Sequence, residues 1–251
     1  MAARPLLRRL AASAALLVLL VPVAACGEPA GPPRLTVFVP SSLTEAFTEL
    51  AADYERDAGV RIRPVFSSSL DLVERLEDRP EADVLIAGDR TALEDVAELL
   101  GDTRVIARTS LTIAVAPGNP KGIRGVTDLA RPGLRVVLGA SLVPVGRYAR
   151  SVLAKERVPV RTASEEISSR AVLTKVRTGE ADAGIVYVTD MRAAGVAAGS
   201  VPIPADQNVT VEYPAAPVRE SDHPEAAEAF VAWLTSAPAR SVLHRHGFAL
   251  P

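Results

Sequence analysis

The 251-residue chain has one cysteine, Cys26, and three histidines, and both shortages limit what it can do. A single cysteine cannot form an internal disulfide, so the folded chain must depend on its hydrophobic core. The histidines, His223, His244 and His246, all fall within the last 30 residues, and the sequence has no G-x-S-x-G, H-E-x-x-H or P-loop motif. These absences argue against a hydrolase or a metalloenzyme. We therefore expect a protein that is not an enzyme.

The chain also lacks an excess of either charge, with 28 basic and 30 acidic residues and a formal net charge of −2. Loss of residues 1–25 would remove three of the 28 basic residues and leave 25 against 30 acidic ones. A mildly acidic protein has no electrostatic footprint for nucleic acid. We therefore expect no nucleic-acid partner.

Residues 1–25 have the parts of a secretory signal. Arginines within the first nine residues precede the apolar run Leu10–Val23, which is shorter than the roughly 20 residues that a membrane-spanning helix needs. Val23-Ala24-Ala25-Cys26 then resembles a bacterial lipoprotein signal, in which the cysteine is lipidated and becomes the first mature residue. The alternative is an ordinary secretory signal with an incidental cysteine. We expect an extracytoplasmic chain, anchored to the cell membrane through Cys26, with residues 26–33 as a tether.

The remaining chain alternates short apolar runs with amphipathic helical faces, which predicts an α/β fold with a mostly parallel sheet. We expect strands near 35–39, 60–66, 83–87, 111–116, 135–138 and 184–187, and helices near 43–57, 70–76, 93–100, from 147, 169–179, 224–234 and 238–247. Pro64 predicts an edge position or a bulge, and two prolines make the segment 211–218 a crossing segment rather than a central strand. Asp222 is the expected cap of the helix that begins with Pro224.

The first strand-to-helix junction is rich in serine. The apolar run Leu35–Val39 stops at Pro40, and Ser41 and Ser42 precede apolar residues at helical spacing. Serine at this position indicates a helix N-cap. In open α/β sheets ligands bind at the carboxyl ends of strands, and a helix N-terminus offers free N–H groups and a positive dipole end to an anion. The two serines could therefore bind an anion or only cap the helix.

Similar junctions recur in both halves of the chain. They are Ser67-Ser68-Ser69, Gly88-Asp89, the loop Gly139–Gly146 and Ser168-Ser169. The only basic residues at these junctions are Arg147 and Arg170, each just inside a helix, and we expect Arg147 to pack or to pair at a cleft edge. A site made of hydroxyls and backbone N–H groups suits a small, fully ionised, dehydrated anion.

In their order and spacing, these stretches resemble the molybdate-binding proteins of ABC importers, which are type II periplasmic binding proteins. The matching stretches, within about residues 34–250, are Thr36–Thr44, Phe66–Ser69, Ala82–Asp89, Val143–Ala149, Gly184–Tyr187 and Val211–Pro214. The resemblance implies two lobes, each a mostly parallel sheet flanked by helices, with a ligand cleft between them. Lobe 1 would comprise residues 34–108 and 212–251, lobe 2 would comprise residues 109–211, and crossings near 108–111 and 209–213 would form the hinge.

The resemblance also implies the residues of the site. The family's anion ligands map onto Ser42, Ser69, Val145, Ser169 and Tyr187. Hydroxyls and backbone N–H groups at the first four would hold the oxygens of molybdate, and Tyr187 would donate its phenol. The molybdenum would be present only as bound molybdate, with no direct protein–metal ligand and no cofactor. On the residues alone, Ser169 could equally cap its helix and Tyr187 could be a core aromatic.

Three departures from the family pattern lie beside these ligands. Val39-Pro40 precedes the two serines where members usually carry alanine, Gly139-Ala140 replaces Asp-Pro, and Val145 replaces alanine. Because Val145 should donate only its backbone N–H, we expect its larger side chain to narrow the pocket.

The function implied by the resemblance is capture of molybdate or tungstate and delivery to the permease and ATPase of an ABC importer. A monomer that closes around the anion would perform it. The alternative is the same fold binding sulfate, phosphate or an organic anion for uptake or sensing. Asp190, which follows a predicted strand, could pair with a hinge group or with the importer.

Overall fold

The structure is a computed structural model that describes residues 33–79, 81–195 and 198–251, all within one compact unit. The predicted signal peptide and Cys26 lie outside the described residues. Among the residues that are described, no helix is both long and apolar enough to cross a membrane.

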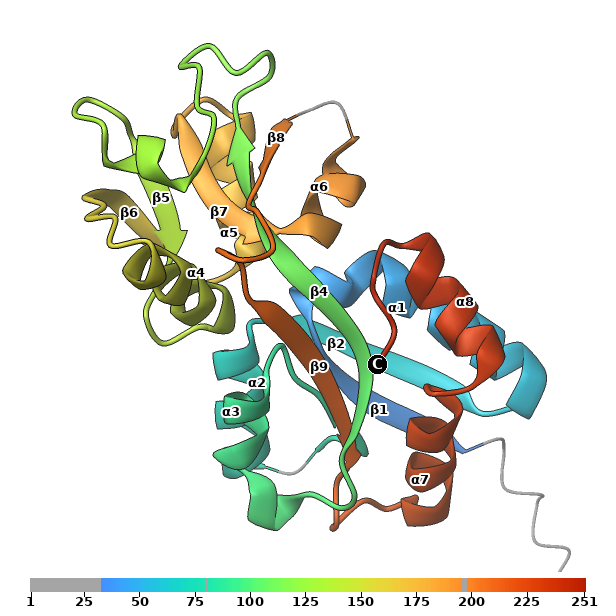
Figure 1. Cartoon of the computed structure of the whole chain (residues 1–251). Helices are drawn as coiled ribbons and strands as arrows, with labels where there is room; N and C mark the ends of the chain where they lie inside the picture. Colours follow the sequence, from blue (N-terminus) through green and yellow to red (C-terminus); the bar gives the residue numbers. More distant parts are fainter. Residues whose placement is uncertain (1–32, 80, 196–197) are drawn as a thin grey trace, which may run out of the picture. The chain divides into compact units, whose positions relative to one another are not determined.

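The described residues form an α/β fold whose elements are drawn in Figure 1. The strands are β1 (Arg34–Pro40), β2 (Arg61–Ser67), β3 (Val84–Ile86), β4 (Arg104–Val115), β5 (Val136–Gly139), β6 (Thr162–Glu166), β7 (Ala183–Tyr187), β8 (Gly199–Pro202) and β9 (Thr210–Pro217). The α-helices are α1 (Thr44–Ala58), α2 (Ser69–Asp78), α3 (Arg90–Glu94), α4 (Pro144–Lys155), α5 (Ser169–Arg177), α6 (Val188–Ala194), α7 (Pro224–Trp233) and α8 (Ala237–Arg245). Short 3-10 turns are η1 (Ser41–Leu43), η2 (Ala97–Leu99) and η3 (Val126–Ala130).

The sheet runs in the order β2-β1-β3-β9-β4-β7-β5-β6, and β8 also pairs with β4. Its outer strands are parallel, because β1 pairs in parallel with β2 and β3, and β5 does so with β6 and β7. Its middle strands are antiparallel, because β9 pairs with β3 and β4, and β4 pairs with β7 and β8. The prediction of a mostly parallel sheet therefore describes the outer strands, and the middle of the sheet is antiparallel.

Strand β4 divides the sheet into two halves, as Figure 1 allows the reader to follow. Its first part, 104–110, pairs with β9, and its second part, 111–115, pairs with β7 and β8. We call the first part with β1, β2, β3 and β9 the first sheet half. The second part with β5, β6, β7 and β8 is the second sheet half. The chain thus passes between the halves along β4 and returns at the start of β9.

The segment 211–218 is a central strand, so the prediction that its prolines fit a crossing segment better was wrong. Proline lacks the N–H that a ladder needs, and in a central strand it is found at bulges. The register of β4 against β9 shifts between Val105 and Ala107, and Pro214 pairs with Val105 at that irregularity. The bulge therefore accommodates a proline that would otherwise interrupt the ladder. Pro64, by contrast, lies in the edge strand β2, as predicted.

Helices cover both faces of the sheet. In β1, Leu35, Val37 and Val39 pack in the cluster that includes α1, α4, α7 and α8, whereas Phe38 points the other way, into the cluster of α2 and α3. This alternation follows from the two-residue period of a strand. Helix α5 covers the corresponding face of the second sheet half. Each sheet half is therefore buried on both sides, which leaves the carboxyl ends of the parallel strands as the accessible edge.

Several helix boundaries differ from prediction for local reasons. Helix α4 begins at Pro144 rather than near 147, because the fixed φ of proline suits the first position of a helix. Helix α7 begins at Pro224 as expected, but its N-cap is His223 without a side-chain cap bond, so the prediction of an Asp222 cap was wrong. The helix expected over 93–100 is broken, because Val96 leaves the helical region and packs in the α2–α3 cluster.

Candidate anion-binding site

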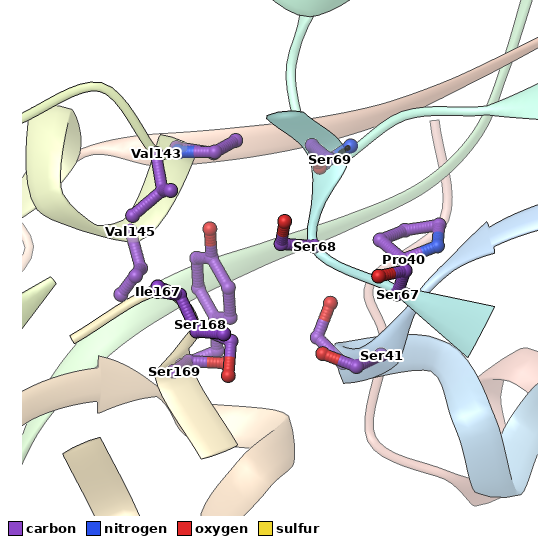
Figure 2. A pocket seen from close by; sticks show the side chains of 14 residues that line it. Pro40, Ser41, Ser67, Ser68, Ser69, Val143, Val145, Ile167, Ser168 and Ser169 are labelled. Atoms are coloured by element: carbon purple, nitrogen blue, oxygen red, sulfur yellow. Dashed lines mark hydrogen bonds between the residues drawn. The ribbon is translucent and has the colours of Figure 1, made fainter. Parts of the chain in front are cut away.

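A small cavity lies where the carboxyl ends of strands meet the N-termini of helices, and its volume is about 30 Å³. The lining residues are Pro40, Ser41, Ser42, Ser67, Ser68, Ser69, Gly88, Val143, Pro144, Val145, Ile167, Ser168, Ser169 and Tyr187. All five residues implied by the family resemblance are among them. Figure 2 shows Ser41, Ser67 and Ser69, at the ends of strands β1 and β2 of the first sheet half, facing Val145 and Ser169, which follow strands β5 and β6 of the second, across the cavity. The structure therefore brings together residues that lie up to about 145 positions apart in the chain.

Ser42 lies in the turn η1, and the capping role left open for the serines before α1 is not observed. The N-cap residue of α1 is Leu43, which makes no side-chain cap bond. The Ser42 hydroxyl instead accepts a hydrogen bond from the Tyr213 hydroxyl at 3.1 Å. Burial raises the pKa of Tyr213 far above its usual value, so this phenol stays protonated and donates. Since the Ser42 oxygen already accepts a bond, its own proton is available to an acceptor in the cavity.

The hydroxyl oxygen of Ser69 also accepts a hydrogen bond, here from a backbone N–H. Ser68 is the N-cap of α2 and accepts a hydrogen bond from the N–H of Asp71 at 3.2 Å. Ser69 is therefore the first residue of the helix, and its buried hydroxyl accepts the N–H of Gly88 at 3.3 Å. A Cβ at position 88 would lie 3.1 Å from the Ser69 oxygen, so glycine permits this close approach. The Ser69 proton is also available to the cavity.

Val145 lies in the first turn of α4, where a helix leaves its N–H groups without an intrahelical acceptor. Its side chain is buried and packs toward Gly139. A Cβ at position 139 would lie 2.6 Å from the Val145 Cγ1 atom and 2.7 Å from the Gly146 nitrogen. Two departures from the family pattern, the glycine at 139 and the valine at 145, therefore fit each other sterically.

Ser168, not Ser169, caps α5, by accepting a hydrogen bond from the N–H of Ala171 at 3.2 Å. Ser169 is the first residue of the helix and is 3% exposed. Tyr187 ends β7, is 3% exposed and packs edge-on against Tyr213. Burial raises the pKa of Tyr187 well above its usual value, so its phenol is a donor at neutral pH. Both residues can thus present a proton to the cavity.

Two arginines join the sheet halves beside the cavity. Arg147 of α4 forms an ion pair with the buried Asp89, whose carboxylate also accepts the N–H of Ala92. Arg170 of α5 donates to the backbone carbonyl of Ser41 and pairs with Glu45. The predicted cleft-edge pairing of Arg147 is confirmed. Neither guanidinium lines the cavity, and within the described residues its lining contains no charged side chain.

The arrangement suits a small anion that carries no proton of its own. Serine hydroxyls, helix N-termini and one phenol face a volume of about 30 Å³. A single water needs about 10–15 Å³ by this measure, whereas pockets for drug-sized ligands have about 300–1,000 Å³. The cavity is thus too small for a large organic ligand. Among the described residues, no group of three or more histidine, cysteine or acidic side chains could hold a metal ion.

Sequence reasoning assigned no role to Tyr213 and left that of Asp190 undecided. Tyr213 lies within one of the stretches that carried the resemblance, but its bond to Ser42 joins residues 171 positions apart. Asp190 is 2% exposed and accepts the N–H of Tyr187 through its Oδ2 atom at 3.0 Å, in a capping box at the start of α6. The sequence carried no capping-box signal here, because that motif has Ser or Thr at the N-cap and Glu or Gln three residues later.

Comparison with known proteins shows that the chain belongs to a known family. The family described as "Bacterial extracellular solute-binding protein" matches residues 35–249. The molybdate-binding protein ModA of Mycobacterium tuberculosis is 35% identical over 248 residues, which cover 93% of this chain and 95% of that protein.

Two solved structures have the same fold. The sulfate-binding protein SubI of Mycobacterium tuberculosis superposes with a TM-score of 0.77 at 20% identity, covering 87% of each chain. The periplasmic molybdate-binding protein of Azotobacter vinelandii superposes with a TM-score of 0.75 at 18% identity, covering 86% of this chain and 99% of that one. At these identities the structures establish the two-lobed periplasmic binding-protein fold and leave the anion open.

Proposed function

We propose that this chain, a member of the bacterial extracellular solute-binding protein family, captures molybdate or tungstate and delivers it to an ABC importer. The observation that carries the proposal is the uncharged cavity in which donors from both sheet halves converge. The ModA relative, at 35% identity along nearly the whole chain, supports molybdate as the anion. On this proposal the chain acts as a binding protein and performs no catalysis.

The site residues are Ser42, Ser69, Val145, Ser169 and Tyr187. Ser42 and Ser69 donate their hydroxyl protons, because each oxygen already accepts a bond from Tyr213 or Gly88. Val145 donates its backbone N–H, and Tyr187 donates its phenol. Hydrogen bonds to a charged acceptor contribute about 1.5–3 kcal/mol each, so several of them can offset the dehydration of a small dianion.

Capture would work by closure of two lobes. Lobe 1 corresponds to residues 34–108 and 212–251 and lobe 2 to residues 109–211, with the hinge near 108–111 and 209–213. The anion would bridge donors of both lobes, and the ion pair of Arg147 with Asp89 would hold the rim closed.

Delivery requires a surface that the importer can recognise. Leu142 and Ile167 are 69% and 71% exposed; Leu142 directly precedes a residue that lines the cavity, and Ile167 lines it. Exposed apolar side chains beside a binding site can contact a partner protein. We propose that the permease contacts this rim, and that lipidation of Cys26 keeps the monomeric protein at the membrane outside the cytoplasm.

A thermal-shift panel of molybdate, tungstate, sulfate, phosphate and chromate tests the anion. A ligand at 100 times its Kd stabilises the folded state by about 2.7 kcal/mol, which for a chain of this size is a shift of roughly 5–10 °C. Molybdate and tungstate should give this shift at micromolar concentration. Phosphate should fail, because it carries a proton at neutral pH and a ring of donors offers that proton no acceptor.

Sulfate is the informative control, because like molybdate it is a fully ionised dianion at neutral pH but is smaller. A smaller anion cannot reach all the donors at once, so we expect at most a weak shift. A clear response to sulfate or phosphate with none to molybdate would contradict the proposal and favour the alternative, the same fold serving another small anion.

A further inference from the structure

A buried carboxyl group lies directly behind the cavity. Asp190 is 2% exposed, and its Oδ2 atom accepts the N–H of the cavity residue Tyr187 at 3.0 Å. Its Oδ1 atom is fully buried and has no hydrogen-bond partner in the described part of the chain. The hydroxyl of Ser169, another cavity residue, lies near enough to lower the pKa of this carboxyl, without a hydrogen bond to Oδ1. Asp190 thus bonds one of the five proposed anion-binding residues and lies beside a second.

Ser169 differs from the other two serines of the site in what its hydroxyl meets. Ser42 and Ser69 each accept a bond from a donor, and their protons therefore face the cavity. Ser169 faces a carboxyl group, and an ionised carboxylate only accepts hydrogen bonds. While Asp190 is ionised, the vacant Oδ1 atom attracts the proton of Ser169 away from the cavity. The third serine donor is then unavailable to the anion.

We propose that Asp190 is a positioning residue whose protonation turns the Ser169 hydroxyl toward the cavity, so that anion capture takes up one proton. The proton comes from solvent and binds the carboxyl group. The new O–H of Asp190 donates to the Ser169 oxygen, and Ser169 donates its own proton to the anion. This inference rests on the proposed function, since it assumes that an oxyanion occupies the cavity.

Direct electrostatics act in the same direction. An ionised carboxylate beside a dianion is repelled by it, and protonation of Asp190 removes the repulsion. Burial raises the pKa of Asp190 to about 6, the largest effect on this group. Arg170 lowers that pKa and Glu45 raises it, and these two side chains pair with each other. Tyr187 and Tyr213 face Asp190 as neutral phenols, whose own pKa values it raises. The carboxyl can therefore exchange its proton near neutral pH.

The test measures the Kd of the purified protein for molybdate from pH 5.5 to 8 by calorimetry. Molybdate stays fully ionised over this range, so a change in Kd belongs to the protein. The Kd should be lowest near pH 5.5 and rise by up to tenfold per pH unit above about pH 6. Titrations at pH 7.5 in buffers of different ionisation heat should show uptake of up to one proton per anion.

Asp190→Asn keeps the shape of the side chain and removes its titration. This variant should bind with a Kd that changes less than twofold across the range. Asp182→Asn is the matched control, because Asp182 is a buried aspartate at the other end of β7 that pairs with Arg135 away from the cavity. His246→Gln is a second control, because His246 contacts Glu49 and does not line the cavity. Both controls should keep the pH dependence of the wild type.

A second, independent measurement uses only the wild-type protein. Infrared difference spectra at pH 7.5 should show a protonated carboxyl band appear when molybdate is added. Tight binding that is independent of pH, with no such band, would overturn the role of Asp190 and leave the proposed function intact. A wild-type pH slope retained in Asp190→Asn would overturn it as well. Absence of molybdate binding at every pH would instead refute the proposed function, and this inference with it.

Discussion

The guanidinium of Arg147 in the second sheet half bonds the buried carboxylate of Asp89 in the first, beside the cavity. Asp89 also caps α3 through the N–H of Ala92, so it is held in place whether or not Arg147 is present. The ion pair therefore joins an acceptor fixed at the start of α3 to an arginine of α4.

Arg147→Met should weaken the binding of molybdate by about tenfold, because one charge-assisted bond between the sheet halves is lost. Calorimetry measures the change. Arg56→Met is the matched control, since Arg56 pairs with Asp53 inside α1 and joins no two parts of the fold. Equal affinities for the Arg147 variant and the control would show that the pair does not favour the closed form.

Ser42→Ala should weaken molybdate binding by about ten- to a hundredfold, the effect of losing one hydrogen bond to a charged group. Tyr213→Phe should weaken molybdate binding only about two- to tenfold, because Ser42 remains and loses only the donor that orients its hydroxyl. The double variant should bind like Ser42→Ala alone, since Tyr213 acts through Ser42. Additive losses in this double-mutant cycle would mean that Tyr213 affects the anion by another route.

The stability of the ligand-free protein should depend on pH through Asp190. Its folded-state pKa of about 6 lies above the ordinary value of 3.8, so its stabilising contribution is present below about pH 4 and is lost as pH rises through 6. Asp190→Asn should consequently be more stable than the wild type at pH 8 by roughly 2–3 kcal/mol, and by much less at pH 4.5. Urea unfolding at both pH values measures the difference. A variant that is less stable than the wild type at pH 8 would contradict the prediction.

Cys26→Ser should move the protein from the membrane fraction to the soluble fraction, because the proposed lipid attachment site is lost. Fractionation of cells that express the full chain, followed by immunoblotting, measures the distribution. A variant that stays with the membrane would rule out lipidation at Cys26 as the anchor.

The double variant Leu142→Ser with Ile167→Ser should slow uptake by the importer by a larger factor than it raises the Kd for molybdate, which is measured in parallel because Ile167 also lines the cavity. Both side chains are mostly exposed, so their replacement should change stability by less than about 0.5 kcal/mol. Leu250→Ser, at an exposed leucine that does not line the cavity, is the control. Uptake at the wild-type rate in the double variant would exclude the rim as the docking surface.

Sequence patterns predicted the junctions of the site but not the bonds that orient its side chains. The apolar run before Ser42 and the helical spacing after it are local features, and they placed this residue at the correct edge of the sheet. Its partner Tyr213 is brought there by the antiparallel pairing of β9, which depends on contacts distant in sequence. The same limitation explains why a capping role for Ser42 stayed open, since capping is the common role for serine when only local sequence is visible.

The short strands β6 and β8 were missed for a different reason. Their burial alternates between half-exposed and exposed residues, and β6 is the polar edge of the sheet. Such strands carry no apolar run, and neighbouring strands stabilise them. Periodicity therefore detected the buried strands that carry the site and missed polar strands at the margin.

The passage of the chain between the sheet halves along β4 and β9 has a mechanical consequence. These two strands are bonded to each other from Arg104 to Ser110, so they form a continuous ribbon. On the proposed two-lobe mechanism, opening would flex this ribbon near Ser110, where β4 changes partner from β9 to β7. A bonded ribbon resists bending elastically, in contrast to a pair of free loops. On the proposed two-lobe mechanism, the resistance of this ribbon to bending would add to the free energy that release of the anion requires.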